Sequence, residues 1–300
     1  MNKKYELLVD DTITFFGWKL FRIKALISFG SVEAGELGGY VAKEGNLSHE
    51  GNAWVYGDAR VYGNAWVYGD ARVYGNAWVY GDARVYGDAR VYGDARVSDN
   101  ARVYDNARVS DNARVYGNAW VYGNAWVSDN ARVYGDAEVY GNAWVYGNAE
   151  VYGNAWVYGD ARVYGNAWVY GDARVYGDAE VYGNAWVSDN ARVYGDARVY
   201  GDARVYGNAR VYGDARVYGD AEVYGDARVK SVKDYIVFKN NWSSGRYFTY
   251  TKSNKMWRAG CFYGTGQELI NEAYKDSENS GKHYKAYVNF VEMLEELENE

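Results

Sequence analysis

Few residues of this chain belong to the types that usually carry catalysis or bind metals. The 300 residues include two histidines, His49 and His283, and one cysteine, Cys261. One cysteine and two separated histidines cannot supply the ligands of a zinc site. Cys261 lies in the segment Gly-Cys-Phe-Tyr, which is more typical of a buried strand than of a nucleophile. We therefore expect no catalytic residue, no metal and no cofactor.

Two glycine- or aspartate-containing patterns could in principle bind ligands. Gly264-Thr265-Gly266 precedes an expected helix, whose amino-terminal end could meet a phosphate. The rest of a phosphate-binding loop is missing, so we expect this segment to cap the helix. The many aspartates lack the nine-residue spacing of calcium-binding rolls. Neither pattern predicts a ligand site.

Composition and charge restrict the class of protein further. The net charge is −7, with 33 basic and 40 acidic residues, which gives no general attraction to nucleic acid or to an anionic membrane. No apolar stretch is long enough to span a membrane, and no leader segment is evident at the amino terminus. A single cysteine does not imply an oxidising compartment. We expect a cytoplasmic protein, located in the host cytoplasm if a phage encodes it.

An internal repeat determines the expected fold. From Val55 to Arg228 a unit of six residues recurs without insertion, 29 times, and His49–Trp54 forms an imperfect thirtieth copy. The common versions are V-Y-G-D-A-R, V-Y-G-N-A-W and V-S-D-N-A-R. If A-R-V-Y is a short strand, alternation points Ala and Val inward and the large residues outward. Gly with Asn or Asp suits a corner, because these residues tolerate left-handed backbone angles.

Three such sides close a triangular coil, and about ten coils spaced by about 4.8 Å make a rod. The pattern resembles the hexapeptide repeat of left-handed β-helix proteins, most closely in the V-S-D-N-A-R units. The resemblance covers the repeat alone and implies a fold rather than an activity. The fold class is thus mainly β, a left-handed parallel β-helix. An amino-terminal cap (1–54) and a small carboxy-terminal α+β domain (229–300) flank the rod (55–228).

Residues 18 apart share one outer column, so the surface can be read from the sequence. Tyrosine occupies 25 of the 29 second positions, and Ser98, Ser110, Ser128 and Ser188 interrupt it. We interpret these serines as drift of the repeat, with a groove at Ser110 and Ser128 as the alternative. Exposed tryptophans mark a candidate interaction surface, in which Trp126 would stack on Trp144 and Trp168 on Trp186. Its six residues are Trp126, Trp144, Trp168, Trp186, Trp120 and Trp156.

The corner residue changes together with the outer residue. Within the repeat every Trp follows Gly-Asn-Ala, whereas most Arg residues follow Gly-Asp-Ala. Arginines stacked at this spacing would repel each other without nearby carboxylates, so we expect a salt-compensated surface, in which the corner aspartates and Glu180, between Arg162 and Arg198, supply the negative charge. Arginine interleaved with aromatic residues can bind single-stranded nucleic acid. The interleaved aspartates cancel that attraction, so we expect no nucleic-acid partner.

The two ends carry a second resemblance. The segments GELGGYVAKEGNLSHEGNAWVYG and GCFYGTGQELINEAY are similar to those of uncharacterised bacterial and prophage hexapeptide-repeat proteins, which are labelled as transferases or polymer-forming proteins. This resemblance implies a phage or mobile-element setting and no established activity. Residues 235–239, 247–252 and 256–263 are expected to be strands, and 266–276 and 281–298 helices, in the carboxy-terminal domain.

Three functions follow from these observations. The first is a non-enzymatic binding solenoid that forms a homo-oligomer, a dimer or a trimer, and contacts a host or phage protein through its carboxy-terminal domain. The second is a phage counter-defence protein that sequesters a host protein or a nucleotide signal. The third is a trimeric acyltransferase. Such enzymes use a histidine base and loops extruded from the coil, and the 29 units contain neither.

Overall fold

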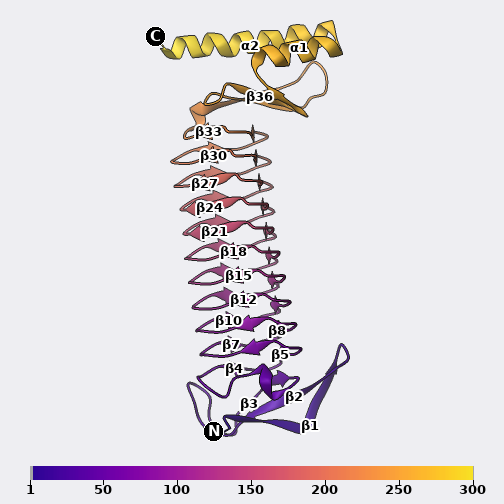
Figure 1. Cartoon of the computed structure of the whole chain (residues 1–300), viewed down its shortest axis with the longest axis vertical. Helices are drawn as coiled ribbons and strands as arrows, with labels where there is room; N and C mark the ends of the chain where they lie inside the picture. Colours follow the sequence, from indigo (N-terminus) through magenta and orange to yellow (C-terminus); the bar gives the residue numbers. More distant parts are fainter. Residues whose placement is uncertain (1–2, 300) are drawn as a thin grey trace.

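Three parallel sheets form the walls of a long rod (Figure 1). The structure is a computed structural model and describes residues 3–299. Each six-residue unit contributes one short strand, and every strand pairs in parallel with the strand of the next coil, as Arg90 does with Arg108. The predicted parallel solenoid with flanking terminal regions is confirmed. The rod has about eleven coils rather than about ten, because a strand of the amino-terminal segment joins it.

The strands of the three walls follow one another in rotation along the chain. The first wall contains β4 (Trp54–Val55), β7 (Arg72–Val73), β10 (Arg90–Val91), β13 (Arg108–Val109), β16 (Trp126–Val127), β19 (Trp144–Val145), β22 (Arg162–Val163), β25 (Glu180–Val181), β28 (Arg198–Val199) and β31 (Arg216–Val217). The second contains β5 (Arg60–Val61), β8 (Trp78–Val79), β11 (Arg96–Val97), β14 (Arg114–Val115), β17 (Arg132–Val133), β20 (Glu150–Val151), β23 (Trp168–Val169), β26 (Trp186–Val187), β29 (Arg204–Val205) and β32 (Glu222–Val223). The third contains β6 (Trp66–Val67), β9 (Arg84–Val85), β12 (Arg102–Val103), β15 (Trp120–Val121), β18 (Glu138–Val139), β21 (Trp156–Gly159), β24 (Arg174–Gly177), β27 (Arg192–Tyr194), β30 (Arg210–Val211) and β33 (Arg228–Val229).

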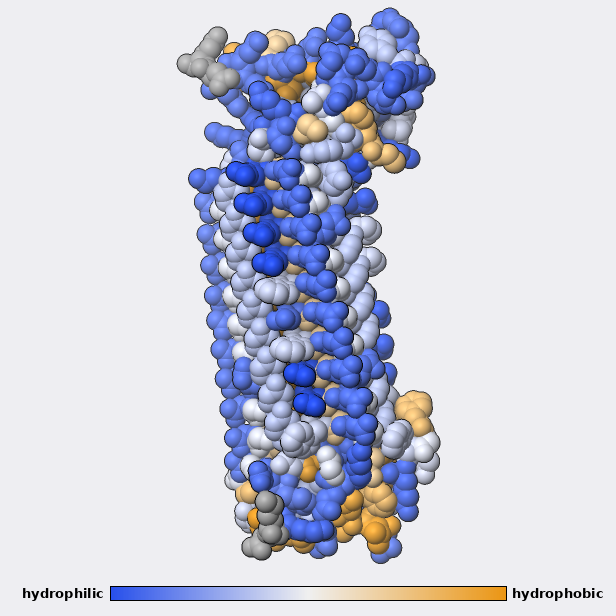
Figure 2. Space-filling view, in the orientation of Figure 1, coloured by the Kyte–Doolittle hydropathy of each residue, from blue (hydrophilic) through white to orange (hydrophobic). Residues whose placement is uncertain are grey.

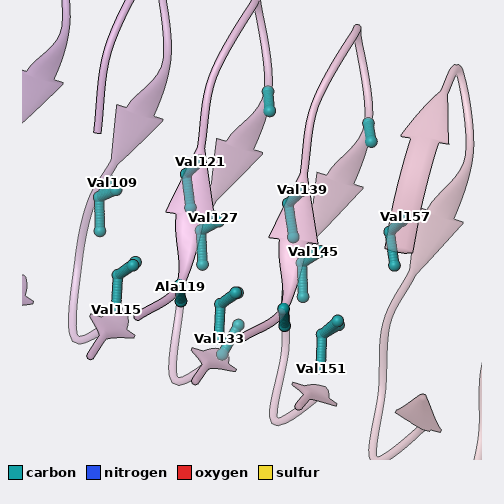
Figure 3. Close-up of a cluster of buried hydrophobic side chains, with 14 of the residues drawn as sticks. Val109, Val115, Ala119, Val121, Val127, Val133, Val139, Val145, Val151 and Val157 are labelled. Carbon is teal, nitrogen blue, oxygen red and sulfur yellow. The ribbon is translucent and has the colours of Figure 1, made fainter. Parts of the chain in front are cut away.

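Alanine and valine alone fill the interior of the repeat. Every Ala and Val from Ala53 to Val229 has an exposed fraction of 0%. Figure 3 shows the valines of successive coils in register, with the side chains of all three walls pointing inward. Alternation along each strand explains this arrangement, because Ala and Val stand two residues apart. Burial of this apolar stack is the main stabilising contribution to the rod.

The corners depend on left-handed backbone conformations. The corner glycines of the rod have φ between 58° and 73°. Five aspartates occupy the same corner position at φ between 55° and 58°: Asp99, Asp105, Asp111, Asp129 and Asp189. A Cβ is costly in this region of backbone space, and each aspartate offsets the cost by accepting a hydrogen bond from a backbone N–H of the next coil. The Oδ2 atom of Asp129, for example, accepts from the Gly147 N–H of the next coil at 3.0 Å.

The amino-terminal segment extends the second wall. β1 (Tyr5–Phe15) and β2 (Trp18–Ala25) form an antiparallel hairpin, and β3 (Leu37–Val41) pairs with both β2 and β5. The short 3-10 helix η1 (Glu44–Asn46) follows. Val41 pairs with Val61, Leu47 with Val67 and Val55 with Val73. The side between Leu47 and Val55 is therefore two residues longer than the others, so residues 49–54 do not form the expected hexad.

The carboxy-terminal domain lies across the far end of the rod (Figure 1). After the 3-10 helix η2 (Val232–Asp234), β34 (Tyr235–Lys239), β35 (Tyr247–Thr251), β36 (Met256–Ala259) and β37 (Phe262–Gly264) form one antiparallel sheet. The helices α1 (Gly266–Asp276) and α2 (Glu278–Asn299) pack together beside it. The strand expected over residues 256–263 is in fact two strands joined by a turn. None of the helices within residues 3–299 is long and apolar enough to span a membrane.

At each end of the rod, side chains from the flanking segments form hydrogen bonds with backbone groups that have no next coil to pair with. The outer residue of each unit donates its N–H to the alanine carbonyl of the next coil, as Arg60 N does to Ala77 O, so alanine carbonyls of the first coil and outer-residue N–H groups of the last coil have no partner in another coil. The buried Asn46 Nδ2 donates to Gly63 O (3.2 Å) and Ala65 O (2.8 Å). The buried Lys4 Nζ donates to Gly51 O (3.2 Å) and Ala53 O (2.9 Å).

At the far end, hydroxyl oxygens act as acceptors. Thr249 Oγ1 accepts from Glu222 N at 2.9 Å, and Ser253 Oγ accepts from Arg228 N at 2.6 Å. Unpaired strand edges promote end-to-end association. The backbone groups that pair with the caps are therefore not available for end-to-end association.

Candidate interaction surface

The outer surface is a lattice of side chains that repeats with each coil. Because strands pair in register, the outer residue of one coil lies over that of the next, as Trp126 does over Trp144. Figure 2 shows the result on one side of the rod as parallel columns of different polarity. Each wall therefore carries one column of Arg, Trp or Glu and, beside it, one column of Tyr.

The tyrosine column of the third wall is uninterrupted for nine rings. From Tyr68 to Tyr212, neighbouring ring centroids are 4.7 to 5.3 Å apart and interplanar angles are 0° to 9°. Stacking partly buries the rings, and this burial raises the pKa of Tyr104 to about 12, with the neighbouring Tyr86 adding to the effect. These rings thus form a continuous aromatic ridge along the rod.

Outer residues lean against the tyrosine that precedes them by 16 residues. All four glutamates of the repeat lie near such a phenol. Tyr122 donates to Glu138 at 3.0 Å, and Tyr134 donates to Glu150 at 2.9 Å. Tyr164 and Glu180, and Tyr206 and Glu222, form the same pairs at 3.4 and 2.9 Å. Burial of the ring, followed by the hydrogen bond to Glu138, raises the pKa of Tyr122.

The arginines are compensated only in part as the sequence indicated: Glu180 pairs with both Arg162 and Arg198 at 3.7 Å, as expected, but within residues 3–299 the corner aspartates do not pair with arginine. Among the described residues, no arginine of the repeat forms an ion pair with a corner aspartate. Their carboxylate partners are glutamates, as in Arg132–Glu150 (3.3 Å). Many guanidinium groups instead lie over tryptophan rings, such as Arg96 over Trp78 at 4.2 Å. The side chain at an outer position reaches along its column more readily than around the corner, which explains the difference.

The six predicted tryptophans are distributed over all three walls. Trp126 and Trp144 lie on the first wall, Trp168 and Trp186 on the second, and Trp120 and Trp156 on the third. Trp168 and Trp186 stack with an interplanar angle of 3°, as expected. Trp126 and Trp144 do not stack, because their rings meet edge to face at 67°. Trp144 is the most exposed of the six, at 43%.

Ser110 accounts for the tilt of Trp126. The Trp126 indole N–H donates to Ser110 Oγ at 3.0 Å, and Ser110 is fully buried. The indole thus occupies the space that a tyrosine ring would fill at position 110. Ser98 is different, because a cavity of about 270 Å³ remains beside it. The sequence predicted serine notches but could not show which of them a neighbour fills.

The residues of catalytic type are occupied by structural contacts or stand alone. His49 stacks on Tyr5 at 4.4 Å and accepts from Lys4 N at 3.2 Å. His283 stacks on Trp242 at 4.6 Å. Cys261 is exposed at a turn, so its expected place in a buried strand is wrong. Residues 3–299 contain no cluster of three His, Cys, Asp or Glu side chains that could hold a metal ion.

The Gly-Thr-Gly segment caps a helix, as predicted. Thr265 Oγ1 accepts from the Glu268 N–H at 3.3 Å, and Glu268 Oε2 accepts from Thr265 N at 2.8 Å. This reciprocal pair is a capping box at the start of α1. The hydrogen bond from the Thr265 backbone lowers the pKa of Glu268.

Fold and surface together define a β-solenoid repeat protein. The family model of the YdcK beta solenoid repeat matches fifteen overlapping segments between residues 53 and 225, which together cover more than half of the chain. The chain therefore belongs to the YdcK beta-solenoid repeat family. No curated protein matches it. The family assigns the repeat and gives no activity.

Proposed function

We propose that the protein is a non-catalytic scaffold that binds proteins, including further copies of itself, through the outer columns of its rod. Its interior is filled by Ala and Val side chains with no exposed surface. The repeat extrudes no loop between Val55 and Arg228. A surface of this kind offers extended, regularly spaced contacts rather than an enclosed reaction site.

The exposed ring of Trp144 is the observation that carries self-association. The Trp144 side chain is 43% exposed and contacts the half-buried Trp126 of the preceding coil. The guanidinium of Arg162, in the next coil, lies 5.7 Å from the Trp144 ring centroid. Aromatic residues and arginine are enriched in protein interfaces and dominate their binding energy. Capping of both ends favours side-by-side association over end-to-end growth.

Sedimentation velocity over a range of concentrations tests this proposal. We expect the wild type to form a dimer or trimer, and Trp144→Arg to shift it to the monomer. Arginine is the commonest outer residue, so the variant retains the repeat. Trp156→Arg, on the third wall, is the matched control and should keep the oligomer. A wild type that is monomeric throughout, or a Trp144→Arg variant that assembles normally, would contradict the proposal.

The carboxy-terminal domain offers a second binding surface. Phe290, Met293 and Leu297 on α2 are exposed by 48%, 60% and 65% and recur at intervals that place them on one side of the helix. This stripe differs from the face that buries Val288 and Val291. We propose that it binds another protein through an apolar contact.

A pull-down with the full chain and a Phe290→Ser, Met293→Ser variant tests this second surface. Partners that require the stripe should be lost in the variant and kept in a Tyr247→Ser control, since Tyr247 is also exposed but lies on β35. Recovery of the same proteins with the variant would remove the stripe as a docking site.

A further inference from the structure

A one-ring interruption of the tyrosine column lies beside Ser98 on the second wall. Tyr62 stacks on Tyr80 at 5.1 Å, and Tyr116 stacks on Tyr134 at 4.8 Å. Ser98 stands between Tyr80 and Tyr116, so each of these rings has one face turned toward the interruption. With one coil advancing the chain by about 4.8 Å, the two rings are separated by roughly twice that distance.

Cations surround this interruption. The cavity of about 270 Å³ is lined by Tyr80, Tyr116 and Ser98, and by the side chains of three stacked arginines, Arg96, Arg114 and Arg132. This volume lies just below the range of about 300 to 1,000 Å³ that is typical of ligand sites, so only a small ligand would fit. Arg114 follows Ser98 by 16 residues, the spacing at which an outer residue leans on its tyrosine elsewhere in the rod.

The local carboxylates, Asp99 and Glu150, offset only part of the charge of the three arginines. Asp99 also lines the cavity, but its Oδ2 accepts from Gly117 N at 3.1 Å. Glu150 pairs with Arg132 at 3.3 Å and accepts from Tyr134. Within residues 3–299, the Arg114 guanidinium has neither an ion-pair nor an aromatic partner. A column of guanidinium groups with one unpaired member attracts an anion.

The other serine positions lack this combination. Ser110 is covered by Trp126, and Ser128 is followed by Trp144 at the leaning position. At Ser188 the corresponding residue is Arg204, which lies 4.8 Å from the Trp186 ring and 3.9 Å from Glu222. Ser98 therefore combines two flanking ring faces with an unpaired guanidinium.

We propose that the Ser98 cavity binds a planar aromatic anion, such as an aryl phosphate or a nucleoside monophosphate. The aromatic ring stacks between Tyr80 and Tyr116 and continues the column at the spacing of its own rings. The anionic group accepts hydrogen bonds from the Arg114 guanidinium, with the neighbouring Arg96 adding positive charge. This site is independent of the self-association proposed above, because it lies on the second wall and Trp144 lies on the first.

Ser98→Tyr is the decisive variant, because it restores the commonest residue of the repeat and fills the cavity with a ring. Isothermal titration calorimetry with 1-naphthyl phosphate measures binding to the full chain. We expect Ser98→Tyr to weaken binding by about tenfold or more, and Arg114→Gln to weaken it by about fivefold. Ser188→Tyr is the matched control and should bind as the wild type does. Inorganic phosphate and 1-naphthol, titrated separately, should each bind more weakly than the joined compound.

Unchanged binding in Ser98→Tyr, or no binding to the wild type, would overturn the proposal. Equal affinity for inorganic phosphate and 1-naphthyl phosphate would also overturn it, because the arginine columns would then act as an unspecific anion exchanger. Thermal denaturation of Ser98→Tyr establishes that the fold is retained, and its melting temperature should equal or exceed that of the wild type.

Discussion

The contacts of the Asn46 side-chain amide in the amino-terminal cap lead to a quantitative prediction. Asn46 is fully buried, its Oδ1 accepts from Lys43 N at 2.9 Å, and its Nδ2 donates to the carbonyls of Gly63 and Ala65. Asn46→Asp keeps the shape and the acceptor but replaces the donor with a second oxygen. Two buried carbonyls then lose their donor, at a cost of about 1 to 3 kcal/mol each. The total loss should be about 2 to 6 kcal/mol near neutral pH.

The pH dependence of the Asn46→Asp variant follows from the same contacts. Burial and the two facing carbonyl oxygens favour the protonated carboxyl, so its folded pKa lies above the unfolded value of about 4. A group with a raised folded pKa gives its full stability below the unfolded pKa and loses it as the pH rises through the folded pKa. The variant should therefore be closest to the wild type below about pH 4, where its protonated carboxyl donates to one of the two carbonyls, and fall further behind it toward neutrality.

Hydrogen exchange of the first coils, together with thermal denaturation at both pH values, measures this effect. The control is Asn76→Asp, the same chemical change at an exposed corner where Asp is common, and it should cost less than about 0.5 kcal/mol. An Asn46→Asp variant as stable as the wild type at neutral pH would refute the proposed donor cap. A variant that is less stable in acid than at neutrality would refute the electrostatic reasoning.

Three further predictions concern the other end, the corners and the tyrosine columns. Thr249→Val should leave Glu222 N without its acceptor, which costs about 1 to 3 kcal/mol and speeds amide exchange at that position, whereas Thr249→Ser should not. Gly141 has φ of 72°, and a Cβ there would lie 3.0 Å from Gly159 N, so Gly141→Ala should lower the free energy of unfolding by about 1 to 2 kcal/mol. Gly141→Asp should cost less in the same denaturation experiment, because the natural corner aspartates accept from the next coil. The raised pKa of Tyr104, about 12, means that stability is complete below about pH 10 and is lost as the pH rises toward 12; tyrosinate absorbance should rise together with unfolding.

The sequence predicts the rod because each six-residue unit specifies both a strand and a corner. Small apolar residues two positions apart require a strand with one buried face, and Gly beside Asn or Asp requires a corner. The longer first side between Leu47 and Val55 was not predictable in this way. It breaks the period, and carbonyls of the first coil bind Lys4 and Asn46, which lie outside the repeat.

The partners of outer side chains were harder to predict than the fold. Covariation within a unit predicted that Arg is compensated by the corner Asp two residues earlier. The observed contacts of the outer side chains instead join residues of neighbouring coils. Glu150 meets both Arg132 of the preceding coil and the phenol of Tyr134. These contacts depend on how far each side chain leans along its column, which the period does not specify. Cys261 was misplaced for a related reason, because a two-residue turn split the expected strand around it.

Specificity in so regular a protein has to arise where the repeat is broken. A perfect column offers the same contact at every coil, so a ligand or partner cannot select a position on it. Replacement of one tyrosine by Ser98 gives the second wall a cavity flanked by rings, while the same change at Ser110 only lets Trp126 fold inward. The outcome thus depends on the residue 16 positions later: arginine leaves the space beside Ser98 open, and tryptophan fills it at Ser110. Exchanging Arg114 for Trp should therefore close the Ser98 cavity without touching the serine, and loss of 1-naphthyl phosphate binding in Arg114→Trp would establish that the pair, rather than the serine alone, makes the site.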